Sequence, residues 1–223
     1  MGITPAELSK IHPTLFHMAE PDTWESIEKN GLLSTSALLD RFCVKAPERK
    51  KIELSNRRSS VEIAHPQYGK VTIRDQIPMT DKALERCLED MTVPEWYRTL
   101  NGRVFFWTTS ERLTRLFDAR AYRGKRQTII TIDTKSFLEE YGEKVELSPI
   151  NSGSTIYKPQ PRGSSTFLPL DRFPFDEWRK KRNSKLKAVV EVTVKKAVPN
   201  LRDFVLRVEH IRENEVLETL YEV

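Results

Sequence analysis

The sequence predicts an α+β fold. Segments with strand character and segments with helix character follow one another along the 223 residues, but without the regular strand–helix alternation that a parallel α/β sheet requires. The chain also contains 10 Phe, 6 Tyr and 4 Trp, enough large apolar side chains for a buried core. Because no change of composition marks a linker, we expect residues 1–223 to form one domain.

The predicted helices combine an apolar face with a start or stop signal. Asp22 is expected to cap the first of them, which has Trp24, Ile27 and Leu32 on its apolar side and ends at Asn30-Gly31. The predicted helical segments are 22–30, 34–42, 80–90, 94–100, 134–141 and a helix that begins at Ser110 and runs towards Tyr122.

Runs of β-branched and aromatic residues predict the strands. The predicted strands are 14–19, 59–64, 103–108, 127–133, 188–194, 204–208 and 216–221, and the rest of 46–69 is ambiguous. The stretch 147–175 is rich in Pro, Gly and Ser and is predicted to be a loop. Loops of this length in compact domains are usually functional or disordered.

Composition excludes several classes of protein. No apolar run reaches the length of a membrane span, and the first ten residues lack the apolar core of a signal peptide. The chain has only two cysteines, Cys43 and Cys87, and four histidines, which argues against a disulfide scaffold or a metal site. We therefore expect a cytoplasmic protein that uses no metal and has no membrane partner.

The positive charge is unevenly distributed along the chain. The net charge is +5 with a pI of about 9.1. Basic residues concentrate in segments 41–74, 98–126 and 179–187, whereas the last 23 residues are acidic. The three basic segments could form one anion-binding surface or three separately solvated faces, and charge alone does not decide between them.

Four positions need a chemical explanation. His17 in the first strand could face a cleft, although a lone strand histidine is more often a satisfied core residue. Arg57-Arg58 either lies on the solvated surface or binds phosphate through bidentate hydrogen bonds. Alternation places Glu191 on the more polar face of its strand, where it is either solvent-exposed or the floor of a cleft.

Arg120 falls inside the apolar stripe of the helix that begins at Ser110, with Arg123 close to it on the helical wheel. A guanidinium on a buried face must be paired or bind a ligand, unless the helix ends before it. The sequence contains no Gly-x-Ser-x-Gly motif and no cysteine with a suggestive neighbour. One histidine, several arginines, one strand glutamate and a Ser/Thr-rich loop suit the binding of an anionic dinucleotide better than peptide hydrolysis.

The order of these motifs resembles that of the DarT-type ADP-ribosyltransferases. In that family a Leu-Tyr-His strand precedes a helix with an Ile and a closing Gly-Leu, and a terminal strand carries the catalytic Glu. The segments that resemble the family's are 15–19 (LFHMA), 26–32 (SIEKNGL), 57–63 (RRSSVEI), 103–107 (RVFFW) and 190–194 (VEVTV), followed by 198–199 and 205–211. Phe16 stands where the family has Tyr, Ala19 where it has Thr, and Thr23-Trp24 where it has Asn-Leu, so the chain resembles a divergent sister group.

The resemblance implies an ADP-ribosyltransferase-like split β-sheet core with peripheral helices and an NAD-dependent ADP-ribosyltransferase activity, with NAD as substrate. It implies that Glu191 stabilises the oxocarbenium-like state or deprotonates the acceptor, with Arg57 or Arg58 at the pyrophosphate or the acceptor. The implied dinucleotide-binding residues are His17, Phe106, Trp107, Arg120 and Arg123. Polar residues of the long loop would contact the acceptor: Asn151, Ser152, Ser154 and Thr166.

The implied acceptor is a nucleic acid, held by the basic segments, and the implied role is that of a toxin or phage-defence effector with an antitoxin protein as a candidate partner. Two other functions stay open on the sequence. One is an NAD-dependent RNA 2'-phosphotransferase on the same fold, which needs His and Arg residues rather than an essential Glu. The other is a catalytically silent module whose basic surface binds nucleic acid or an acidic protein.

Overall fold

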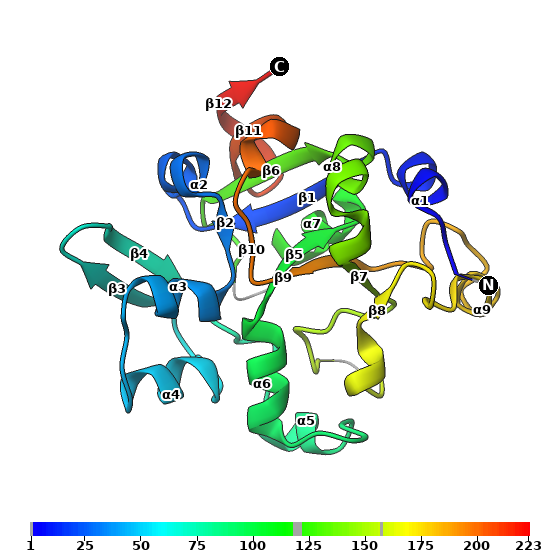
Figure 1. Ribbon diagram of the computed structural model, residues 1–223, viewed down its shortest axis with the longest axis horizontal. Coiled ribbons are helices and arrows are strands. Elements are labelled where there is room, and N and C mark those ends of the chain that lie inside the picture. The colour runs from blue at the N-terminus through cyan, green and yellow to red at the C-terminus, as the bar shows by residue number, and fades with distance from the viewer. Residues whose placement is uncertain (1, 118–121, 157) are drawn as a thin grey trace.

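A large antiparallel sheet forms the centre of the computed structural model, which describes residues 2–117, 122–156 and 158–223 (Figure 1). Its strand order is β12-β11-β6-β1-β5-β9-β7-β8, and neighbouring strands all pair antiparallel. The strands are β1 (Thr14–Ala19), β5 (Arg103–Trp107), β6 (Gln127–Asp133), β7 (Val145–Ser148), β8 (Leu168–Pro169), β9 (Glu191–Lys195), β11 (Val205–Arg212) and β12 (Glu215–Glu222). The predicted α+β class is confirmed.

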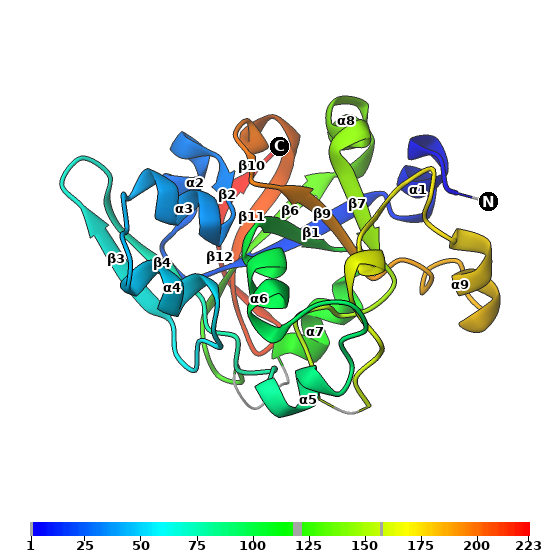
Figure 2. The ribbon, with the colours of Figure 1, turned by 60° about the horizontal axis from the view of Figure 1, so that its bottom comes forward.

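Helices pack on both faces of this sheet and beyond one end of it (Figures 1 and 2). The helices are α1 (Pro5–Ile11), α2 (Trp24–Asn30), α3 (Thr35–Arg41), α4 (Glu48–Glu53), α5 (Asp81–Glu85), α6 (Val93–Asn101), α7 (Ser110–Phe117), α8 (Thr134–Tyr141) and α9 (Phe175–Lys181). Apolar side chains of α1, α2 and α8 join those of β1, β5, β6 and β9 in the largest core cluster. Leu113 of α7 packs on the opposite face, against Phe16 and Trp107.

The sheet opens between β1 and β5. These strands pair at Phe16–Trp107, whereas β1 pairs with β6 along its whole length. One residue further along β1, the His17 side chain rather than the backbone contacts the carbonyl oxygen of Phe105, with Nδ1 2.8 Å from it. Beyond the Phe16–Trp107 pair, the described residues of the two strands are not joined by backbone pairing. Residues that lie between β1 and β5 in the sequence line the space where the strands separate.

Two small sheets flank this opening. One joins β2 (Leu32–Leu33) to β10 (Ala197–Val198), and the other is the hairpin of β3 (Val61–His65) and β4 (Gly69–Ile73). Gly31 ends α2 with φ 75°, and a Cβ there would lie 2.4 Å from the backbone of Pro199. Glycine thus permits both the turn and the close approach of the second chain segment.

Most predicted elements are present, and several differ in extent. The first helix has Thr23 rather than Asp22 as its N-cap residue, and Leu32 lies in β2 rather than on that helix. The predicted helix 80–90 shrinks to the short α5. Helices α1, α4 and α9 and strands β4 and β7 were not predicted, and the first two residues of the predicted loop 147–175 are the last two of β7. No described helix is both long and apolar enough to cross a bilayer.

Candidate functional site

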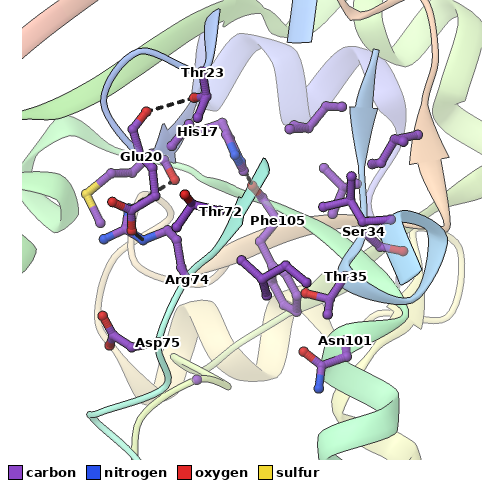
Figure 3. A pocket seen from close by; sticks show the side chains of 18 of the residues that line it. His17, Glu20, Thr23, Ser34, Thr35, Thr72, Arg74, Asp75, Asn101 and Phe105 are labelled. Atoms are coloured by element: carbon purple, nitrogen blue, oxygen red, sulfur yellow. Dashed lines mark hydrogen bonds and ion pairs between the residues drawn. The ribbon is translucent and has the colours of Figure 1, made fainter. Parts of the chain in front are cut away.

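A cavity of about 840 Å³ occupies the opening in the sheet (Figure 3). Its walls come from β1, α2, α3, the β3–β4 hairpin and β5, and from the 151–156 segment with the first residue of β9. Figure 3 shows His17, Thr72, Arg74, Thr35 and Asn101 around this space, so segments far apart in the sequence share one site.

Glu191 lies on the cavity wall at the start of β9, where it pairs with Trp107 of β5 and with Ser148 of β7. It is only 3% exposed. The backbone N–H of Ser152 donates a hydrogen bond of 3.1 Å to its Oε1. Oε2 is buried and has no hydrogen-bond partner among the described residues, so it is available to accept a hydrogen bond from a donor in the cavity. Of the two alternatives left open by the sequence, the structure shows the cleft rather than solvent exposure.

The surroundings of Glu191 bias its carboxyl group towards the neutral form. Burial raises the pKa of Glu191 to about 7, and this outweighs the Ser152 hydrogen bonds and the positive charges of Arg112 and Arg162, which act in the opposite direction. A carboxyl group that titrates near neutrality in a cavity is a candidate for acid–base or electrostatic catalysis.

The backbone that holds Glu191 is itself held by a buried arginine. Arg162 is 2% exposed, and its Nη1 donates to the carbonyl oxygens of Ser152 and Ser154, both at 3.0 Å. Its Nε donates to the carbonyl oxygen of Gln160 at 3.0 Å. Arg162 therefore fixes the 152–154 backbone in the conformation that directs the Ser152 N–H at Glu191.

His17 presents one ring nitrogen to the protein and one to the cavity. Because a carbonyl oxygen only accepts, Nδ1 carries the hydrogen that bonds Phe105, which leaves Nε2 as an acceptor in the neutral ring. Burial lowers the pKa of His17 to about 4; the bond to Phe105 opposes this, and the charge of Arg74 adds to it. His17 is therefore neutral at physiological pH and can accept a hydrogen bond from a ligand hydroxyl.

Arginines from several elements line the cavity, and most of them have partners within the protein. Arg74 pairs with Glu20, Arg103 with Glu146, and Arg115 with Glu111. The Nε atom of Arg112 is buried and, among the described residues, lacks a hydrogen-bond partner, although the group interacts electrostatically with Glu191. An anionic ligand would satisfy such a group.

Arg57 lines the cavity, but it also has a structural role. Its guanidinium donates to the carbonyl oxygens of Arg74 and Ile52 and to Oδ1 of Asn101. Burial lowers the pKa of Arg57 to about 10, which leaves it charged at neutral pH. Arg58, in contrast, is exposed and does not line the cavity, so of this pair the structure brings Arg57 to the site.

The other predicted site residues divide between the cavity and the rest of the fold. Trp107, Asn151, Ser152 and Ser154 line the cavity. Phe106 does not: it is 0% exposed and packs against Phe137, on the face of β5 opposite to that of Phe105 and Trp107, which line the cavity.

Thr166 is buried in a short 3-10 turn, where its Oγ1 accepts a hydrogen bond from the Gly163 N–H, and it lies outside the cavity wall. Arg120 falls outside the described residues. Arg123 is exposed in the turn that follows, and it is Tyr122 from this turn that lines the cavity.

A second groove of about 470 Å³ adjoins the cavity across the 151–156 segment. Asn151, Ser154 and Ile156 line both spaces. The charged residues on its wall are all basic: Lys158, Arg162, Lys181 and Arg182. Lys181 and Arg182 lie over the ring of Trp178, at 4.4 Å and 5.1 Å from its centre. This groove gathers part of the third basic segment beside the Glu191 end of the cavity.

Comparison with known protein families identifies the family of this chain. A model for a family of unknown function, DUF7002, matches residues 13–205. The chain belongs to the DUF7002 family. The matched residues include every element of the cavity wall from β1 to β9, so in this DUF7002 member the site lies within the family's own region. No match is found among curated proteins.

Three functional candidates of this DUF7002 chain were missed from the sequence. Arg112 lies in the first turn of α7, and only the tertiary structure shows that it reaches the cavity. Arg162 lies in the segment predicted as a loop, where no periodic pattern marks a buried side chain. Arg41 ends a correctly placed helix, and only the tertiary structure shows that it reaches the cavity. Among the described residues, no group of three or more His, Cys, Asp or Glu could hold a metal ion.

Proposed function

We propose that the protein is an NAD-dependent ADP-ribosyltransferase that modifies a nucleic acid. The observation that carries the proposal is that one cavity holds a buried glutamate, with an oxygen that no described residue bonds, and a neutral histidine, whose other ring nitrogen bonds Phe105. The buried, unpartnered Nε of Arg112 adds a site for anionic oxygen. A ligand with ribose hydroxyls and phosphates supplies partners for all three groups.

The roles of the residues follow from the charges that develop in the reaction. Cleavage of the nicotinamide–ribose bond sends its electron pair to the nicotinamide and leaves positive charge on the ribose. The ionised carboxylate of Glu191 stabilises that charge through space and accepts a hydrogen bond from a ribose hydroxyl. An acceptor nitrogen or oxygen then forms the new bond to the ribose, and its proton passes to Glu191 or to water. His17 orients the ligand by accepting a hydroxyl hydrogen at Nε2.

The basic groove is the proposed binding site for the acceptor. It shares Asn151 and Ser154 with the cavity, so a strand bound there would pass beside the Glu191 end. Its cations are suited to phosphodiester oxygens, which bind with an affinity that falls as salt rises. The resemblance to DarT-type enzymes also underlies the proposal of a toxin or phage-defence role with an antitoxin partner.

A single incubation tests the activity. The protein is mixed with NAD labelled in its adenylate half and with DNA, RNA and protein acceptors, and the product that carries the label is identified. We expect label on nucleic acid, and none with Glu191→Gln. Label on protein alone would contradict the proposed acceptor but not the transferase, and release of phosphate from 2'-phosphorylated RNA would instead indicate a 2'-phosphotransferase.

Different pH dependences are expected for NAD binding and for turnover. Because only ionised Glu191 stabilises the cation, kcat/KM should fall about tenfold per pH unit below pH 7, where the pKa of Glu191 lies. The Kd for NAD should stay constant down to about pH 5, because the low pKa of His17 keeps its Nε2 an acceptor. Calorimetry and steady-state kinetics at matched pH values check this, and parallel curves for both quantities would contradict it.

The acceptor groove makes a prediction about salt. The variant Lys158→Gln/Lys181→Gln should reduce the slope of log K against log salt for oligonucleotide binding by about one to two, with NAD binding unchanged. Lys50→Gln/Lys51→Gln, which removes two exposed charges from α4, is the matched control. Fluorescence anisotropy with a labelled oligonucleotide measures both slopes, and equal effects of the two double variants would exclude the groove as the binding site.

A further inference from the structure

The cavity has a second end, away from Glu191. Strand β9 is about 13 Å long at 3.3 Å per residue, and Glu191 begins it. Its other end leads into β10, which pairs with β2 directly before α3. In Figures 1 and 2, α3 and the β3–β4 hairpin lie beside that end. We call the part of the cavity between α3 and the hairpin the distal arm; it is lined by Thr35, Leu38, Arg41, Tyr68, Lys70 and Val71.

Arg41 is the cation held in place within the distal arm. Its Nη2 donates a 2.7 Å hydrogen bond to Oδ1 of Asn30, and its guanidinium lies 4.7 Å from the centre of the Tyr68 ring. Tyr68 is in turn stacked on His65, with ring centres 4.7 Å apart. These contacts restrict the guanidinium before any ligand binds, which reduces the entropy that binding would cost.

The charge of Arg41 is not neutralised by an ion pair within the described part of the chain, unlike those of Arg74, Arg103 and Arg115. The other cation of the distal arm, Lys70, is paired with Glu62 at 2.9 Å. Arg41 thus retains donors and a full positive charge for an incoming anion, and a guanidinium binds phosphate oxygens through two parallel hydrogen bonds.

We propose that Arg41 binds a phosphate of the adenosine half of the dinucleotide, with Asn30 and Tyr68 as positioning residues. The proposal rests on the proposed function, since it assumes that the reacting ribose lies at Glu191. A ligand that reaches from Glu191 to α3 must be elongated, and its far half then lies in the distal arm. The phosphate is either that of the pyrophosphate or a 2'-phosphate on the adenosine ribose, and both present the same chemistry to the guanidinium.

The test compares ligands with and without phosphate. Binding of NAD, NADP, ADP-ribose, AMP, inorganic pyrophosphate and adenosine is measured by calorimetry for the wild type, Arg41→Gln and Lys29→Gln. Lys29 is exposed one residue before Asn30 and does not line the cavity, so its variant removes an equal charge nearby. We expect Arg41→Gln to lower the affinity for phosphate-bearing ligands about tenfold or more and to leave the affinity for adenosine unchanged. Lys29→Gln should change neither affinity.

The ligand series separates the two sources of phosphate. If the affinities for NAD, ADP-ribose and NADP fall equally, Arg41 binds the pyrophosphate. If the affinity for NADP alone falls, Arg41 binds the 2'-phosphate. Two results would overturn the proposal: Arg41→Gln binds every ligand with the wild-type affinity, or its affinity for adenosine falls as much as that for AMP. NAD turnover by the wild type would still support the proposed function in either case.

The opposite failure is also recognisable. If the wild type binds pyrophosphate through Arg41 but binds neither NAD nor ADP-ribose, the proposed function is wrong and the phosphate site stands; if it binds none of these ligands, both are wrong. Should Arg41→Gln fail to fold, Tyr68→Leu removes the ring beneath the guanidinium instead. It is expected to weaken the same phosphate ligands by a smaller factor and again to spare adenosine, and an unchanged profile would then contradict the proposal.

Discussion

Glu191→Gln should abolish NAD cleavage and at the same time make the protein more stable at alkaline pH. The expected loss of turnover is about a thousandfold or more, because the amide carries no charge to stabilise the developing cation. The side chain keeps its shape, and its oxygen can still accept the Ser152 N–H. NAD binding should therefore survive, so the variant separates binding from chemistry.

The gain in stability follows from the direction of the pKa shift. Burial raises the pKa of Glu191 to about 7 from an ordinary value of 4.5, so the folded state binds a proton more tightly than the unfolded state. Stability is then lost as the pH rises from about 4.5 to about 7, by up to about 3 kcal/mol. The glutamine removes this loss, and urea unfolding at pH 5 and pH 8 should show a gain at pH 8 only.

The exposed Glu85 of α5 provides a matched control. Glu85→Gln should change neither turnover nor the difference in unfolding free energy between the two pH values. If Glu191→Gln retained full NAD cleavage as a folded protein, Glu191 would not be the catalytic carboxylate. If it were destabilised at pH 8, its carboxylate would not be the buried charge that the structure indicates.

Arg162→Met should impair catalysis from a position that touches no ligand in the main cavity. It leaves the carbonyl oxygens of Ser152 and Ser154 without their donor, at an expected cost of about 3 kcal/mol in the free energy of unfolding. The Ser152 N–H then no longer points at Glu191, and we expect kcat to fall 10- to 100-fold with a smaller change in the KM for NAD.

A pH profile distinguishes this positioning role from simple loss of stability. Both Arg162 and the Ser152 N–H lower the pKa of Glu191, so their removal should move the midpoint of the pH–rate profile above 7. Arg162→Lys keeps the charge and should move it less, and Arg86→Met, on the exposed C-cap of α5, should not move it at all. A lower kcat with an unchanged midpoint would indicate that Arg162 acts only on the fold.

The central sheet could be predicted where local signals are strong. The bounds of β1, β6 and α8 match the prediction: the two strands are rich in apolar and β-branched residues, and α8 lies between the cap residues Asp133 and Gly142. Strand β7 was missed because it is short and depends on pairing with β9, which no local pattern encodes. Helix α1 was missed although Thr4 and Glu7 form a capping box, since its apolar face is brief.

Several residues of the candidate site could be predicted, but not the contacts that bury them. Strand alternation placed Glu191 on the polar face, yet its burial comes from the 152–154 backbone and from Arg162, which meet it only in the folded chain. The same limit explains Phe106: an aromatic strand predicts stacking surfaces, but the face that each ring takes depends on where β1 and β5 separate. Which arginines reach the cavity could not be predicted either, because their partners come from distant elements.

The imidazole of His17 also bridges β1 and β5 at the point where their backbones separate. If β1 and β5 continued to pair beyond Phe16 and Trp107, backbone bonds would satisfy the Phe105 carbonyl and the strands would close over the site. The side chain satisfies that carbonyl instead, at the position where the two strands separate. One residue therefore both bridges the separated strands and lines the cavity, and we expect substitutions of His17 to change the opening of the sheet together with the cavity wall.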